Sequence, residues 1–140
     1  MSRVFWDTNL FVYLLEDFGE LSERVAGIRQ HMLARGDQLC TSTLTLGEVL
    51  VKPLEAGDTA LAQRFEEVIS GTALVIPFDG AAARTFARFR ADRSLKPPDA
   101  IQLACAAQAN TDLFITNDDR LARTVAPGVQ FIVSLARAPL

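Results

Sequence analysis

The sequence has very few of the residues that build the commonest hydrolytic and metal sites, with one histidine and two cysteines among 140 residues. No second histidine accompanies His31, and no serine or cysteine stands in a recognisable nucleophile motif, so we predict no catalytic triad and a surface or boundary position for His31. Cys40 and Cys105 have no Cys or His neighbour at metal-ligand spacing. We therefore expect two small core residues rather than a disulfide or a zinc site.

Long apolar runs and an excess of positive charge are also absent. No stretch of about 18 apolar residues occurs, and no basic segment followed by an apolar one opens the chain, so we expect neither a transmembrane helix nor a signal peptide. A cytoplasmic protein is the resulting expectation. The net charge of −3 argues against a protein that holds nucleic acid by overall positive charge, although it leaves room for a local basic rim.

Hydrophobic residues are plentiful, at 49% of the sequence, and this is enough for the core of a single domain spanning residues 1–140. Short apolar runs typical of strands alternate with helical patterns, at residues 3–6, 39–43, 73–76, 113–116 and 130–133. Apolar strands separated by helices fit a parallel sheet that is covered on both faces. The predicted fold is therefore an α/β/α sandwich with a central parallel sheet of four to five short strands.

Three of the expected helices carry proline or capping signals. The helix that starts at Leu44 should be kinked or stopped by Pro53. The helix capped by Asp79 is expected to run through about Arg93. A further helix, residues 99–109, begins after two prolines and consists almost entirely of Ala, Leu, Ile and Cys, so we expect it to be buried.

Four acidic residues stand apart from those on the polar faces of helices. Asp7 and Asp118 each follow an apolar strand, at the end of the strand where ligands bind in open α/β sheets. Asp99 opens the buried helix, and Glu48 lies in a helix that is apolar around most of its circumference, where an isolated carboxylate is costly to bury. Each also has a structural explanation: caps or turns for Asp7 and Asp118, a favourable helix dipole for Asp99, and an arginine partner for Glu48.

A cleft shared by all four acids would need a cation. Like charges a few ångströms apart raise one another's pKa values and destabilise the fold unless they are neutralised. Oxygen ligands without His or Cys select a hard ion such as Mg²⁺ or Mn²⁺. Because such ions activate water and stabilise charge on a phosphodiester, the pattern predicts metal-assisted cleavage of a nucleic acid.

Four motifs in this order make the chain resemble a PIN-domain protein, and most closely the VapC-type toxin ribonucleases of bacterial toxin–antitoxin pairs. The motifs are Asp7-Thr8-Asn9, Thr45-Leu46-Gly47-Glu48-Val49-Leu50, Pro98-Asp99-Ala100-Ile101-Gln102-Leu103-Ala104 and Ile115-Thr116-Asn117-Asp118. The resemblance covers essentially the whole chain. It implies an α/β/α sandwich whose acidic cluster binds one or two Mg²⁺ or Mn²⁺ ions and hydrolyses RNA.

The resemblance also implies roles for individual residues. The metal-binding, catalytic acids correspond to Asp7, Glu48, Asp99 and Asp118. Thr116 corresponds to a hydroxyl residue that orients a carboxylate or water. Asn9 is a second such group or simply a helix-start residue. The spacing from Thr116 favours Asp118 over the adjacent Asp119. A homodimer and a cognate antitoxin, whose C-terminal segment lies across the acids, are the partners that the resemblance implies.

Basic residues flank the last two motifs, and they are either substrate contacts or ordinary solvated surface. They are Arg93, Lys96, Arg120 and Arg123. Two alternatives to a toxin remain, namely a PIN nuclease in RNA processing and a non-catalytic PIN-like binding module. A phosphatase of the haloacid-dehalogenase type is disfavoured because it requires an acid where this sequence has Asn9.

Overall fold

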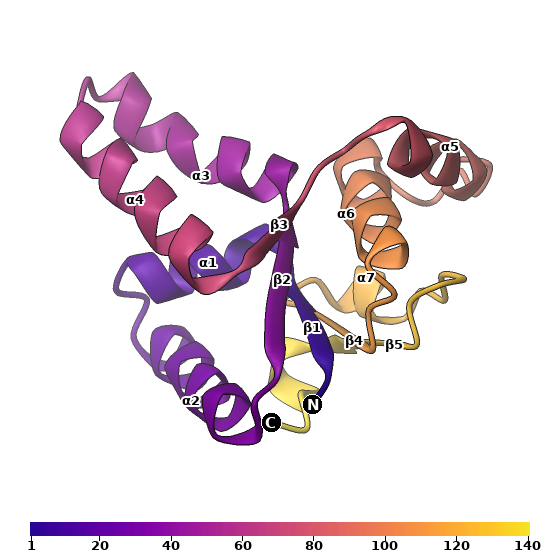
Figure 1. Ribbon diagram of the computed structural model, residues 1–140, viewed down its shortest axis with the longest axis horizontal. Helices are drawn as coiled ribbons and strands as arrows, with labels where there is room; N and C mark the ends of the chain where they lie inside the picture. The colour runs from indigo at the N-terminus through magenta and orange to yellow at the C-terminus, as the bar shows by residue number, and fades with distance from the viewer.

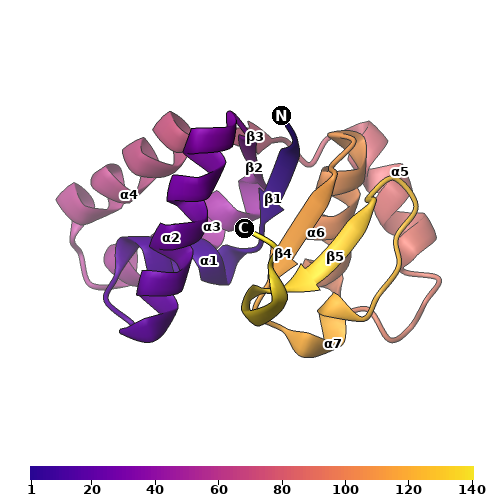
Figure 2. The same cartoon turned by 90° about the horizontal axis from the view of Figure 1, so that it is seen from below.

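The computed structural model, which describes residues 1–140, is built on a five-stranded parallel sheet with the strand order β3-β2-β1-β4-β5. The strands are β1 (Arg3–Trp6), β2 (Gln38–Ser42), β3 (Leu74–Ile76), β4 (Leu113–Thr116) and β5 (Phe131–Ser134). Helices α1 to α4 lie on one side of the sheet and α5 and α6 on the other (Figures 1 and 2). This arrangement confirms the predicted α/β/α sandwich.

The helices follow the strands in the expected alternation. They are α1 (Thr8–Leu15), α2 (Glu20–Arg35), α3 (Thr43–Glu55), α4 (Thr59–Thr72), α5 (Gly80–Phe89), α6 (Pro97–Gln108) and α7 (Asp119–Ala122), with a final 3₁₀ turn at Leu135–Arg137. No helix is both long and apolar enough to span a membrane.

The central strand β1 divides the core into two layers. Val4 and Trp6 pack against the layer that contains α1 and α2, whereas Phe5 belongs to the layer that contains α6, because successive strand side chains point to opposite faces. Phe5 stacks on Phe114 of β4 with 5.0 Å between ring centroids. Burial on both faces explains why this strand is almost wholly apolar.

The two cysteines are buried and free, as predicted. Both belong to the core layer on the α6 side of the sheet. Burial, with a smaller effect from the charge of Asp79, raises the pKa of the Cys105 thiol to about 11. Cys105 is therefore an inert core residue at neutral pH.

Two helix ends differ from the sequence prediction. Pro53 is buried inside α3, and the helix continues for two more residues before it ends at Glu55. Helix α5 ends at Phe89 rather than at about Arg93. The Asp92 carboxylate accepts hydrogen bonds from the backbone N–H and the hydroxyl of Ser94, and this local turn competes with continued helix.

The carboxyl ends of the three middle strands meet at one edge of the sheet. Trp6 at the end of β1 is in register with Ile115 of β4, and β2 ends at Ser42 on the other side of β1. Asp7 and Ser42 then cap α1 and α3 with their side chains. The caps therefore place polar side chains together at the edge of the sheet where α/β proteins bind ligands.

Candidate functional site

A small polar cleft at this edge brings together residues from four separate segments of the chain. Its lining consists of Asp7, Thr8, Asn9, Glu48, Pro98, Asp99, Gln102 and Asp118. All four acids singled out in the sequence line this one cleft. No group of three or more His, Cys, Asp or Glu side chains is arranged closely enough to hold a metal ion as it stands.

Asp7 is held at the bottom of the cleft by neutral hydrogen-bond donors alone. Its Oδ1 accepts from the backbone N–H of Thr8 at 2.9 Å, and its Oδ2 accepts from the hydroxyl of Thr116 at 2.8 Å. Gln102 Nε2 lies farther away, at 3.4 Å from Oδ1. Burial raises the pKa of Asp7 above its ordinary value despite these hydrogen bonds. Asp7 thus has fixed geometry but no counter-charge.

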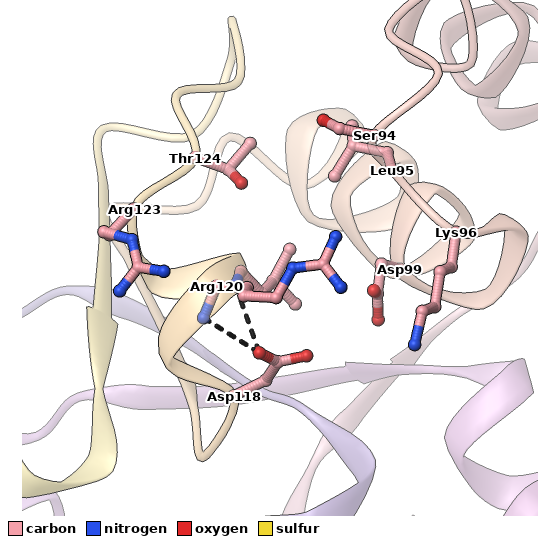
Figure 3. Close-up of a pocket in the computed structure, with 9 residues that line it drawn as sticks. Ser94, Leu95, Lys96, Asp99, Asp118, Arg120, Arg123 and Thr124 are labelled. Atoms are coloured by element: carbon pink, nitrogen blue, oxygen red, sulfur yellow. Dashed lines mark hydrogen bonds between the residues drawn. The ribbon is translucent and has the colours of Figure 1, made fainter.

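Thr116 and Asp118 form the second anchored part of the site. Thr116 is fully buried at the end of β4, and its hydroxyl oxygen accepts the backbone N–H of Asp118 while donating to Asp7. The Asp118 carboxylate accepts the backbone N–H groups of Arg120 and Leu121 (Figure 3). One hydroxyl therefore fixes the spacing between two of the acids.

The neighbouring acid Asp119 lies elsewhere. It is exposed and lines a different pocket, together with residues of β5 such as Val133 and Ser134. The spacing from Thr116 that favoured Asp118 in the sequence therefore agrees with the position of Asp118 in the cleft.

Asp99, in the first turn of α6, is electrostatically coupled to the other acids. Partial burial raises the pKa of Asp99, and the negative charges of Asp7 and Asp118 raise it further, while Lys96 and Arg120 act in the opposite direction. Like charges close together oppose ionisation, so Asp99 lies near enough to Asp7 and Asp118 for their charges to raise its pKa.

Glu48 differs from the sequence interpretation in one respect. Its side chain is exposed at the rim of the cleft, so the argument from the cost of burying an isolated carboxylate was wrong. Glu48 lies on the exposed face of α3 and reaches toward Thr8 of α1. Glu48 Oε1 accepts a hydrogen bond from the hydroxyl of Thr8 at 2.6 Å, and this hydroxyl takes the place of the arginine partner considered from the sequence.

Gln102 is a site residue that the sequence interpretation missed. It is 1% exposed and lies one helical turn after Asp99, so both side chains reach the same face of α6. Its Nε2 donates to Thr45 Oγ1 at 2.7 Å and to Thr8 Oγ1 at 3.1 Å. The available signal was an amide whose immediate neighbours in the helix are small or apolar, because a buried amide requires several polar partners.

A second pocket adjoins the acidic cleft and shares Asp99 and Asp118 with it. Three of the four predicted basic residues, Lys96, Arg120 and Arg123, line this pocket (Figure 3), and Arg93 does not. The guanidinium of Arg120 extends toward Asp99, whereas that of Arg123 points away from it. The one side-chain ion pair in the molecule joins Arg35 to Asp37, so none of the three cations beside the cleft forms a close salt bridge with a carboxylate.

Asn9 lines the cleft from the first turn of α1, but its side chain makes no hydrogen bond to Asp7 or to any other residue. It is exposed to solvent. Its proposed orienting role therefore has no support from contacts within the chain.

Fold and site together define an α/β protein with an acid-lined cleft at the carboxyl edge of a parallel sheet. The family model for the PIN domain matches residues 4–126. The chain therefore belongs to the PIN domain family. No relative is found among curated proteins.

Several solved structures share the fold over nearly the whole chain. One is VapBC2 from Rickettsia felis bound to a DNA fragment from its promoter, with a TM-score of 0.75 at 14% identity, covering 94% of this chain and 98% of that one. Another is a toxin–antitoxin complex from Klebsiella pneumoniae, with a TM-score of 0.66 at 26% identity, covering 90% and 94%. A third is VapBC-5 from Mycobacterium tuberculosis, with a TM-score of 0.61 at 21% identity, covering 95% and 99%.

Proposed function

We propose that this PIN-domain protein is a Mg²⁺- or Mn²⁺-dependent endoribonuclease, and that it is the toxin of a type II toxin–antitoxin pair. The observation that carries the proposal is the convergence of Asp7, Glu48, Asp99 and Asp118, which come from four distant segments, on one cleft. Asp7, Glu48 and Asp118 accept hydrogen bonds only from neutral groups, and no basic side chain forms an ion pair with any of the four acids.

The donor set fits a hard divalent ion. Every charged group in the cleft is a carboxylate, and hard ions prefer oxygen ligands. Asp7, Asp99 and Asp118 would hold the ion. Burial raises the pKa values of Asp7 and Asp99, and neighbouring carboxylates raise them further, so a bound cation would favour the ionised forms. Glu48 would either bind metal or position the attacking water. When bound, the ion supplies an activated water and stabilises charge on the leaving oxygen.

The remaining residues of the site position these groups and the substrate. Thr116 keeps Asp7 and Asp118 at a fixed spacing. Lys96, Arg120 and Arg123 lie in the adjoining pocket, where they would bind the phosphates that flank the cleaved bond. Glu48 would position the attacking water, and these cations would hold the RNA whose phosphodiester is hydrolysed.

The proposed partner is a cognate antitoxin. The structural neighbours from R. felis, K. pneumoniae and M. tuberculosis are toxin–antitoxin complexes. An apolar groove between α1, α3 and α4 begins at Glu48, and its lining includes Val12, Leu15, Val49 and Phe65. An antitoxin segment in this groove would reach the acids, where an arginine would supply counter-charge in place of metal. A homodimer in the cytoplasm is proposed on the same resemblance.

Cleavage of RNA by the purified protein tests the activity. We expect cleavage with Mg²⁺ or Mn²⁺, none with chelator, and none when Asp7→Asn or Asp118→Asn replaces either anchored acid. Asp119→Asn is the matched control and should cleave like the unchanged protein, because Asp119 lines a different pocket. Cleavage that resists chelator, or that survives Asp7→Asn, would contradict the proposal.

The toxin assignment has its own test. Expression of the protein should stop growth, and coexpression of a DNA-binding protein encoded by an adjoining gene should restore it. An active nuclease with no effect on growth would indicate a processing enzyme instead.

A further inference from the structure

The amide of Gln102 lies at the centre of a buried polar network beneath the acidic cleft. It belongs to α6, but its partners belong to other elements: Ser42 at the end of β2, Thr45 in α3, and Thr8 in α1. An amide that is 1% exposed destabilises a core unless its donors and acceptor are satisfied. Here every polar atom of the side chain has a partner.

The Glu48 carboxylate at one end of this network sets the direction of its hydrogen bonds. An ionised carboxylate only accepts hydrogen bonds, so the single hydroxyl proton of Thr8 points at Glu48 Oε1, 2.6 Å away. The Thr8 oxygen must then accept any further hydrogen bond. Gln102 therefore presents its Nε2 to Thr8, and its Oε1 accepts from the hydroxyl of Ser42.

Thr8 has an alternative partner in the same network. Its Oγ1 lies 3.2 Å from Oγ1 of Thr45, which itself lies 2.8 Å from the hydroxyl of Thr41. Without a donor from Gln102, the proton of Thr8 is free to turn toward Thr45. Glu48, which is exposed and receives no other hydrogen bond from a side chain, would then lose its only restraint.

We propose that Gln102 is a positioning residue of the active site. Its Nε2 fixes the Thr8 hydroxyl as the donor that holds Glu48 over the cleft, and the same group supports Oδ1 of Asp7 at 3.4 Å. Helix α6 thus contributes Asp99 directly and controls the position of Glu48 through Thr8. The inference rests on the proposed function and adds to it the group that orients Glu48, the acid held by a single side-chain hydroxyl.

The test compares Gln102→Leu with Gln108→Leu. Gln108 lies on the same helix, is exposed, and donates to Thr85 Oγ1 at 2.8 Å away from the cleft. For Gln102→Leu we expect kcat for RNA to fall about 10- to 100-fold, the range for groups that orient the residues of a metal site, with Mn²⁺ affinity and KM each changed less than about threefold. Gln108→Leu should match the unchanged protein in all three. Equal effects of the two variants, or no effect of Gln102→Leu, would overturn the proposal.

A double-mutant cycle separates positioning from a general loss of packing. Thr8→Val removes the hydroxyl that connects Gln102 to Glu48. If Gln102 acts through Thr8, combining Thr8→Val with Gln102→Leu should cost little more than either change alone, since coupled residues are not additive. Fully additive losses would contradict this path. Should Gln102→Leu fail to fold, Gln102→Glu keeps the side-chain shape and replaces the Nε2 donor with an oxygen, and the same losses are expected.

A crystal structure of each protein without divalent ions distinguishes failure of this inference from failure of the proposed function. Glu48 should occupy one conformation against Thr8 in the unchanged protein and several in Gln102→Leu. A single unchanged Glu48 conformation in both would refute the role of Gln102 whether or not the protein cleaves RNA. Absence of Mn²⁺ binding and cleavage in the unchanged protein would refute the proposed function alone.

Discussion

The two sides of the acidic cleft are built differently. On the side of the sheet, Asp7 and Asp118 are helix caps whose carboxylates accept backbone N–H groups, and Thr116 joins them. On the opposite side, Glu48 comes from an exposed position of α3 and is held by one hydroxyl. The first arrangement is rigid because it is part of the fold. The second depends on a side-chain network, so we expect the two sides to respond differently to substitution.

The substitution Glu48→Gln should reveal the largest functional difference between the two sides of the cleft. If the anchored acids hold the ion and Glu48 positions water, kcat should fall about 100-fold or more, as for other proton-transfer groups, while Mn²⁺ affinity changes little. Steady-state cleavage and calorimetric titration with Mn²⁺ measure the two quantities. A loss of Mn²⁺ affinity equal to that of Asp99→Asn would instead make Glu48 a metal ligand and remove the functional distinction.

Thr116→Val tests the rigid side. The change keeps the shape of the side chain but removes the bond to Asp7 and the acceptor for Asp118, so Mn²⁺ affinity should fall about 10- to 100-fold. The control is Thr111→Val, since Thr111 is also buried and its hydroxyl donates to the backbone carbonyl of Ala106 away from the cleft. Comparable Mn²⁺ affinity in both variants would show that Thr116 does not organise the acids.

Substitution of the cations beside the cleft should have a smaller effect, confined to substrate binding. Arg120→Ala and Arg123→Ala should each weaken RNA binding in a salt-dependent manner, reducing the slope of log K against log salt by roughly one. Arg93→Ala is the control, because Arg93 lies outside the pocket. RNA binding is measured by fluorescence anisotropy across a salt series. Unchanged slopes would show that neither arginine contacts the substrate.

The smallest expected effect is the contribution of Asp7, on the rigid side of the cleft, to the pH dependence of stability. The raised pKa of Asp7 means that the folded state binds its proton more tightly than the unfolded chain does. In chelator, stability should therefore fall as pH rises from the unfolded value of 3.8 through the folded pKa, with the full penalty present above the folded pKa.

Asp7→Asn should accordingly raise the Tm in chelator at pH 7 and have little effect below pH 3.8. Fluorescence of Trp6, the single and fully buried tryptophan, reports unfolding. A Tm that falls at pH 7 would show that the hydrogen bonds of Asp7 outweigh the cost of its burial.

The same contrast explains what the sequence was able to predict. Asp7 and Asp118 follow apolar strands, and parallel strands bring their carboxyl ends to one edge, so their proximity follows from local pattern and topology. The alternation of elements was also readable, because each strand is a short apolar run. Two features could not be read from the sequence. Tertiary packing sets the continuation of α3 past Pro53, and a side-chain turn at Asp92 sets the end of α5.

The network below the cleft could not be predicted from the sequence. Gln102, Thr8 and Thr45 are separated by up to 94 positions, and no local pattern indicates that their side chains contact one another. Their roles depend on which hydroxyl faces which amide, and this is decided by packing of α1, α3 and α6 at the sheet edge. The exposed position of Glu48 has the same origin.

Anomalous diffraction from crystals soaked in Mn²⁺ tests the central claim most directly. The account predicts an anomalous peak in the cleft, ligated by Asp7, Asp99 and Asp118, that disappears in Asp7→Asn crystals treated in the same way. A peak at another surface with none between these carboxylates, or an unchanged cleft peak in Asp7→Asn, would contradict it.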